Sequence, residues 1–412
     1  MKISQVTEPA KTLDVTGEYD VVVAGGGIAG VAAAVAAARN GASVCLLERM
    51  FSLGGLATLG NVTVYLPICD GMGRQVMAGL PEELLKLSVA DLQHDNKQAR
   101  FLGVPDCWKD GGDVTQRKTQ RYKTSFNPSS YLLALEQLVL EAGVDLLYDT
   151  RVCSVLRNVD RITHLVIENK SCRSAIACKT VIDATGDADI CQLAGERTES
   201  LDNNVLTGWF YELRRDGLKQ TPWTNKCSRD GTKDGTGPFF RGDNARDITS
   251  HVIESRKVMR QKLQEQRSES PDDDIQIFNP PTIACLRMTR RLVGDFSLGW
   301  GHIHQWFDDA VGLTGDWRKR GPVFAVPYRA LTGVANRNLL AVGRCMSADT
   351  TIWDLTRAIP TCALTGTAAG VSASLAIDAG GDVLNIEIDK LQSRLREQGA
   401  LLDPELVKPA QV

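Results

Sequence analysis

The sequence lacks the cysteine patterns that hold metals or redox-active disulfides. Its 11 cysteines are scattered, and no two of them form a C-x-x-C pair. This argues against a zinc ribbon, an iron–sulfur cluster or a C-x-x-C disulfide, and no other ligand spacing indicates a metal site. Scattered free thiols are typical of a reducing compartment, so we expect a cytoplasmic protein.

The chain also lacks an unbroken hydrophobic run and an excess of one charge. Residues 21–38 carry no charge, but three consecutive glycines and many alanines make a membrane span a poor interpretation. Residues 1–18 are polar and contain no apolar core of a secretory signal. A net charge of −3 gives no reason to expect nucleic acid or an anionic membrane as a partner.

A glycine-rich unit near the N-terminus is the strongest pattern that the sequence does contain. A β-branched run at 21–23 leads into Gly25, Gly27 and Gly30, which form G-x-G-x-x-G. Gly25 permits a tight turn, Gly27 lets a pyrophosphate approach the backbone, and Gly30 lets the following helix pack on the strand. The pattern predicts a dinucleotide site; an ordinary βαβ unit with a glycine turn is the alternative.

The residues that follow complete the unit. An alanine-rich helix is expected over 28–39, and a second buried strand over 43–47 delivers Glu48. A carboxylate at this position can accept hydrogen bonds from ribose hydroxyls. The amino-terminal end of the helix would direct its free N–H groups and its positive dipole end at the phosphates.

Three further segments are predicted to reach the same edge of a sheet. The first is LGGLAT at 53–58, and the second is a strand that ends in ATGDAD at 184–189. The third is a strand at 338–342, followed by Gly-Arg and a long apolar helix at about 356–377. Ligands bind at the carboxyl ends of strands in open α/β sheets, so this convergence suits a long cofactor.

With these motifs the chain resembles the FAD-dependent oxidoreductases of the glutathione-reductase-like fold. It is distantly similar to fumarate reductase and succinate dehydrogenase flavoproteins and to the flavin subunit of heterodisulfide reductase, over about residues 15–380. The resemblance implies an α/β fold, with a Rossmann-like FAD-binding domain and an inserted α+β substrate or cap domain. It also implies non-covalent FAD, because no histidine stands where a covalent link would be expected.

The resemblance further implies which residues contact FAD. Glu48 would hold the adenosine ribose, Val152 would offer its backbone to the adenine, and Arg344 stands where many relatives have aspartate. The full set of expected FAD contacts is Gly25, Gly27, Ile28, Ala29, Gly30, Glu48, Arg49, Gly54, Gly55, Ala57, Thr58, Val152, Ala184, Thr185, Gly186, Asp187, Gly343, Arg344 and Ile359.

We expect the FAD-binding domain to be discontinuous in sequence. Its three parts are predicted at residues 1–85, 126–200 and 335–385. A small cap insertion is predicted at 86–125, a substrate or cap domain at 201–334 and a C-terminal tail at 386–412.

Catalytic candidates come from the predicted substrate domain. His302 and His304 could transfer a proton near neutral pH, whether they share a strand face or lie in a loop, and a structural histidine pair is the alternative. Arg291 belongs to a cluster with Arg287 and Arg290. The cluster could grip a carboxylate, as the distant likeness implies, or it could form an ion-pair network or contact the FAD phosphates. Tyr328 could donate a proton or anchor the core.

We therefore expect an FAD-dependent oxidoreductase that transfers a hydride between flavin N5 and a small organic substrate of unknown identity. The electron acceptor is unknown, a second G-x-G-x-x-G for a nicotinamide is absent, and a homo-oligomer is left open. The alternatives are a flavin monooxygenase or halogenase-like enzyme, and a non-catalytic flavoprotein or electron-relay subunit.

Overall fold

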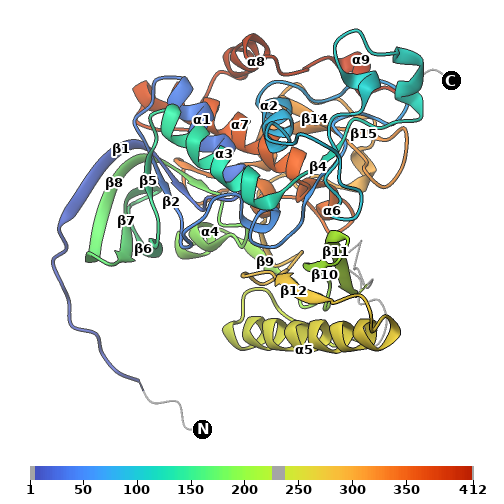
Figure 1. Ribbon diagram of the computed structural model, residues 1–412. Helices are drawn as coiled ribbons and strands as arrows, with labels where there is room; N and C mark the ends of the chain where they lie inside the picture. Colours follow the sequence, from blue (N-terminus) through green and yellow to red (C-terminus); the bar gives the residue numbers. More distant parts are fainter. Residues whose placement is uncertain (1–4, 225–236, 411–412) are drawn as a thin grey trace.

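The computed structural model describes residues 5–224 and 237–410. The largest sheet in the described residues has seven strands (Figure 1). Its strands are β1 (Val15–Ala24), β2 (Val44–Leu47), β5 (Asp145–Leu147), β6 (Arg151–Asn158), β7 (Arg161–Asn169), β8 (Cys172–Asp183) and β16 (Leu339–Ala341). The strand order is β5-β2-β1-β8-β7-β6, and β16 pairs with the carboxyl-terminal end of β8. We call this sheet the main sheet.

Strand β8 changes partners along its length. Its first half pairs with β7 in an antiparallel ladder, and its last residues, Val181–Asp183, pair in parallel with both β1 and β16. Strands β5, β2, β1, β8 and β16 consequently form a parallel layer whose carboxyl ends lie at one edge. This confirms the expected Rossmann-like arrangement.

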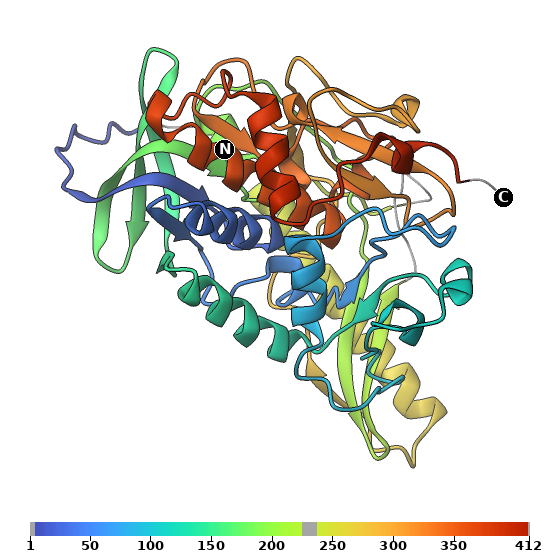
Figure 2. The same ribbon diagram turned by 90° about the horizontal axis from the view of Figure 1, so that it is seen from above.

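Helices α1 (Ile28–Arg39) and α7 (Ile359–Leu375) pack closely on one face of the main sheet (Figures 1 and 2). A Cβ atom added at Gly366 would lie 2.1 Å from the carbonyl oxygen of Ala29, so only glycine permits this backbone approach. Most residues of both helices are buried, which explains their composition of alanine and other small residues.

Successive side chains of β1 point to opposite faces of the sheet, so they pack in two separate cores. Val21 and Val23 pack in the larger core with α1 and α7, whereas Val22 and Ala24 pack in a smaller core on the other face. No helix within residues 5–224 and 237–410 is long and apolar enough to cross a membrane.

A separate lobe lies beside the main sheet and is drawn below it in Figure 1. It consists of β10 (Gly208–Arg214), β11 (Gly217–Thr224), β12 (Gln276–Asn279) and the long helix α5 (Ala245–Glu269), and we call these elements the cap. The strand order is β11-β10-β12. The Asn244 side chain caps α5 by accepting hydrogen bonds from two backbone N–H groups of its first turn.

The remaining elements complete the larger core or connect it to the cap. They are β3 (Val64–Tyr65), α2 (Leu80–Ser88), β4 (Thr124–Ser125), α3 (Pro128–Glu141), α4 (Asp189–Leu193), β9 (Thr198–Ser200), β13 (Arg290–Leu292), β14 (Ala310–Gly315), β15 (Val323–Pro327), α6 (Trp353–Thr356), α8 (Ile388–Glu397) and α9 (Pro404–Val407). The β14–β15 hairpin, from within predicted segment 201–334, packs in the same core as α7. The division into domains stays a prediction.

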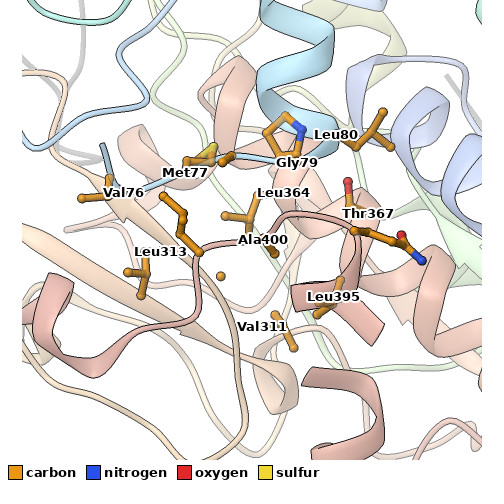
Figure 3. Close-up of a pocket in the computed structure, with 15 residues that line it drawn as sticks. Val76, Met77, Gly79, Leu80, Val311, Leu313, Leu364, Thr367, Leu395 and Ala400 are labelled. Atoms are coloured by element: carbon orange, nitrogen blue, oxygen red, sulfur yellow. The ribbon is translucent and has the colours of Figure 1, made fainter. Parts of the chain in front are cut away.

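A small apolar cavity lies where α2, α7, β14 and the segment after α8 meet (Figure 3). Its volume is about 20 Å³, and its walls include Met77, Leu313 and Leu364. A space of this size holds about one water molecule and no organic ligand. We interpret the cavity as a packing gap rather than a ligand site.

Candidate functional site

A groove of about 890 Å³ runs along the carboxyl-terminal edge of the parallel strands. The residues that follow β1, β2, β8 and β16 line one side, and residues of α5 and of segment 282–290 line the other. The volume is at the upper end of the range of about 300–1,000 Å³ that is usual for small-molecule sites. Its position at this edge makes the groove the candidate functional site.

The geometry of the turn between β1 and α1 explains the three glycines of the G-x-G-x-x-G motif. Gly25 has a φ of +104°, and a Cβ there would lie 2.5 Å from the carbonyl oxygen of Ala184. At Gly30, in the first turn of α1, a Cβ would lie 1.8 Å from the carbonyl oxygen of Gly25, so the helix could not pack this close to the turn with any other residue. At Gly27, by contrast, a Cβ would meet no protein atom within 4 Å, and Gly27 lines the groove.

Glu48 lies at the end of β2 and is held in place by the backbone. One carboxylate oxygen accepts a hydrogen bond from the Gly26 N–H at 2.6 Å, and the other accepts one from the Met50 N–H at 2.7 Å. Burial raises the pKa of Glu48, and these two hydrogen bonds act in the opposite direction. Glu48 lines the groove beside Arg49, and the lone pairs that remain on its oxygens are available to a ligand.

The turn after β8 is fixed by Arg344. Its guanidinium donates to the carbonyl oxygen of Gly186 at 2.5 Å, to the carboxylate of Asp187 at 2.8 Å and to the carbonyl oxygen of Leu286 at 2.8 Å. Arg344 therefore joins the ATGDAD turn to segment 282–290, which also contacts this turn directly through Thr289 and Arg290. Ala184 and Thr185 line the groove at the same turn.

Two more segments complete the wall. Gly54 and Gly55 have φ values of +95° and +56°, and the Gly54 N–H donates to the carbonyl oxygen of Gly26, which brings this turn against the first one. Val152 lines the groove near Glu48, and Ile359 does so at the amino-terminal end of α7. The remaining expected contacts on the wall are Ile28, Ala29 and Ala57.

Three of the expected FAD contacts lie behind the wall rather than on it. Besides Gly30, these are Thr58, whose hydroxyl donates to the carbonyl oxygen of Leu53, and Gly343, whose N–H donates to the Thr365 hydroxyl. A Cβ at Gly343 would lie 2.8 Å from that of Ala29, so this glycine keeps the turn close to α1. These residues support the groove without lining it.

The two histidines proposed for catalysis lie away from the groove. His302 ends a short 3₁₀ helix, accepts a hydrogen bond from the Gly299 N–H at 3.0 Å and packs against Phe296. Nδ1 of His304 lies 2.6 Å from the carbonyl oxygen of Val407. Neither lines the groove. His302 belongs to the 3₁₀ helix and His304 lies in the turn that follows it, so they do not share a strand face.

Arg291 and Tyr328 are also occupied elsewhere. Arg291 is 6% exposed and forms an ion pair with Glu199. The Tyr328 hydroxyl contacts the Ser372 hydroxyl and donates to the carbonyl oxygen of Val383 in the larger core. A catalytic role for these four residues stays a prediction, and their contacts give each of them a structural role.

Sequence reasoning missed most of the cap side of the groove. Ile248 and Val252 of α5 line it, together with Ile283 from the segment after β12. Arg287, which the sequence suggested as part of an arginine cluster, lines the groove as well. The spacing of Ile248 and Val252 by four residues places them on one helix face, but nothing in the sequence tells which surface that face covers. In the described residues, no group of three His, Cys, Asp or Glu side chains could hold a metal ion.

The sequence matches the model of the family described as FAD dependent oxidoreductase over residues 20–204 and 209–395. The chain belongs to this family. It is therefore an FAD-dependent oxidoreductase, and FAD is its cofactor.

Individual relatives are more distant. A thioredoxin reductase from Ureaplasma parvum serovar 3 is 40% identical over 72 residues, which are 18% of this chain and only 23% of that protein. A chain of the Mycobacterium smegmatis Sdh1 complex is 14% identical with a TM-score of 0.46, covering 93% of this chain and 72% of that one. A geranylgeranyl bacteriochlorophyll reductase-like protein from Thermoplasma acidophilum is 14% identical with a TM-score of 0.42, covering 96% and 89%. Likenesses at this level carry no argument about the reaction.

The geometry of the first turn fits FAD. The open space beside Gly27 is where a side chain would block the approach of a pyrophosphate, and the amino-terminal end of α1 begins at the next residue. Glu48 lies at the end of the neighbouring strand, where the adenosine ribose is expected.

Proposed function

We propose that this oxidoreductase transfers a hydride between N5 of its FAD and a small organic substrate that binds between the main sheet and the cap. The observation that carries the proposal is the two-sided groove. One side consists of glycine turns and helix ends that suit an extended cofactor, and the other side consists of cap side chains that suit a small molecule.

The chain itself would bind and orient both groups. Gly25 and Gly27 would let the pyrophosphate approach the start of α1, and Glu48 would accept hydrogen bonds from the ribose. Ile359 lies at the start of α7, whose positive dipole end would favour negative charge on the flavin ring. Ile248 and the other apolar cap side chains would exclude water from the substrate.

Side chains for proton transfer are scarce in the groove. Among the described residues that line it, none is histidine, tyrosine or lysine. Asp189 also lines the groove, and burial, with the negative charges of Asp187 and Asp183, raises its pKa to about 6. We infer that Asp189 is the groove carboxyl best suited to exchange a proton near neutral pH, and that other protons exchange with solvent.

The test is to mix the purified holoenzyme, without oxygen, with a panel of hydroxy acids, sugars and amines. The proposal predicts that one class bleaches the flavin absorbance and is recovered with two hydrogen atoms fewer. The Gly27→Val variant, which we expect to lack FAD, is the control for reactions that do not need the cofactor.

Two results would overturn the proposal. Consumption of substrate only in the presence of oxygen, with an oxygen atom added to the product, would indicate a flavin monooxygenase. Fast electron exchange with a protein partner and no reaction with any organic substrate would indicate an electron-relay subunit.

A further inference from the structure

Arg287 differs from Arg290 and Arg344 of the groove in having no acidic partner. Arg290 forms an ion pair with Asp189 at 2.5 Å, and Arg344 forms one with Asp187 at 2.8 Å. Arg287 lines the same part of the groove, but it forms no ion pair with any described residue. Its Nε atom is buried and has no hydrogen-bond partner.

The position of Arg287 is fixed from both ends. Its backbone N–H donates to Oδ1 of Asn204 at 2.8 Å, and the Asn204 side chain is itself buried and donates to the carbonyl oxygen of Met288. The guanidinium lies over the ring of Trp209, 5.7 Å from its centroid, which is within the range of cation–π attraction. The group is therefore oriented before any ligand binds.

Arg287 lies away from the end of the groove where the adenosine is expected. The carbonyl oxygen of the preceding residue, Leu286, accepts a hydrogen bond from Arg344, which follows β16. Glu48 follows β2, and β1 and β8 lie between β2 and β16 in the main sheet. Arg287 is thus on the side of the groove away from the expected adenosine.

Apolar side chains line the same groove as Arg287. They are Ile248 and Val252 of α5, Ile283, and Leu56 and Leu59 from the side of the main sheet. A guanidinium without an acidic partner, in a groove with such side chains, matches a ligand with an apolar body and one negative charge. The planar fork of arginine binds a carboxylate through two hydrogen bonds, and one positive charge balances one carboxylate but not a phosphate dianion.

We propose that Arg287 binds the carboxylate of an amphiphilic substrate, whose apolar body lies against the cap helix α5. This inference rests on the proposed function, because it assigns the substrate class of the same site. The sequence suggested this role for Arg287, Arg290 and Arg291 together. The structure singles out Arg287, because Arg290 is paired with Asp189 and Arg291 with Glu199.

The experiment follows the flavin absorption spectrum of the holoenzyme during titration with octanoate, acetate, octanamide and octyl phosphate. We expect octanoate to shift the spectrum at the lowest concentration. Acetate lacks the apolar body and octanamide lacks the charge, so both should bind about tenfold or more weakly. The Arg287→Gln variant should lose about tenfold or more in octanoate affinity while it keeps its FAD, and Arg287→Lys should recover part of the loss.

The matched control is Arg241→Gln, which removes an exposed arginine close to the start of α5, outside the groove, and should change nothing. Equal binding of octanoate and octanamide, tighter binding of octyl phosphate, or an unchanged octanoate affinity in Arg287→Gln would overturn the inference. Loss of FAD from Arg287→Gln would also overturn it, because the arginine would then serve the cofactor. A protein without any flavin spectrum would instead refute the proposed function.

Discussion

The two sides of the groove are built from different parts of the amino acid. On the main-sheet side backbone turns form much of the wall, and glycines such as Gly25 and Gly27 are there because any side chain would collide or fill the site. On the cap side the wall consists of side chains, such as Ile248 and Arg287. A backbone wall suits one invariable cofactor, whereas a side-chain wall is where a substrate can be selected.

The largest effect is expected from a substitution that breaks the close contact between α1 and α7, behind the main-sheet side of the groove. Gly366→Ala places a methyl group 2.1 Å from the Ala29 carbonyl oxygen, and overpacking of this kind costs about 1–3 kcal/mol, or more where a backbone cannot move. We expect a markedly lower melting temperature together with loss of FAD. Gly301→Ala is the control, because a Cβ there meets no atom within 4 Å. Equal melting temperatures would refute the close α1–α7 contact.

The second effect separates cofactor binding from folding. Gly27→Val adds a side chain that meets no protein atom but projects into the groove. FAD retention should fall about tenfold or more, since overpacking costs about 1–3 kcal/mol and 1.4 kcal/mol is tenfold. The melting temperature should equal that of the wild-type chain stripped of FAD. A variant that retains FAD would show that this turn is not the cofactor cradle.

The third effect tests the histidines outside the groove. His302→Ala removes an acceptor for the Gly299 N–H, and His304→Ala removes the contact with Val407, so each should cost about 1 kcal/mol of stability. From these contacts we expect a lower melting temperature and an unchanged turnover per bound FAD. A loss of turnover with FAD and melting temperature unchanged would instead support the catalytic role that the sequence suggested.

The smallest effect concerns Asp189. Its pKa of about 6 in the folded chain lies above the value of 3.8 of an ordinary aspartate, so folding takes up a proton between these two pH values. The charged carboxylate therefore opposes folding above pH 6, and this penalty disappears as the pH falls toward 4. Asp189→Asn should raise the melting temperature slightly at pH 7.5 and less at pH 5. A difference that grows on acidification would contradict the raised pKa.

The sequence was informative about the main-sheet side because glycine positions encode backbone geometry. The helix expected over 28–39 is α1, and the turns at Gly25, Gly54 and Gly186 all have positive φ, which the glycine pattern suggests directly. The cofactor wall follows from such local rules.

The cap side could not be predicted because it depends on contacts between distant segments. Ile248 and Ile283, 35 residues apart in the sequence, line the same groove only because of the tertiary fold. His304 contacts the carbonyl oxygen of Val407, 103 residues later, and does not line the groove. The ion pairs of Arg290 with Asp189 and of Arg291 with Glu199 likewise depend on acidic residues that no local pattern identifies, and so does the lack of an acidic partner for Arg287.

The visible absorption spectrum of the purified protein, before and after heat denaturation, tests the central claim most directly. We predict flavin bands that move to the supernatant on denaturation as free FAD, in about one equivalent per chain, and that are absent from Gly27→Val. A colourless protein that cannot be reconstituted with FAD would contradict the account of the groove, and a chromophore that stays in the pellet would contradict non-covalent binding.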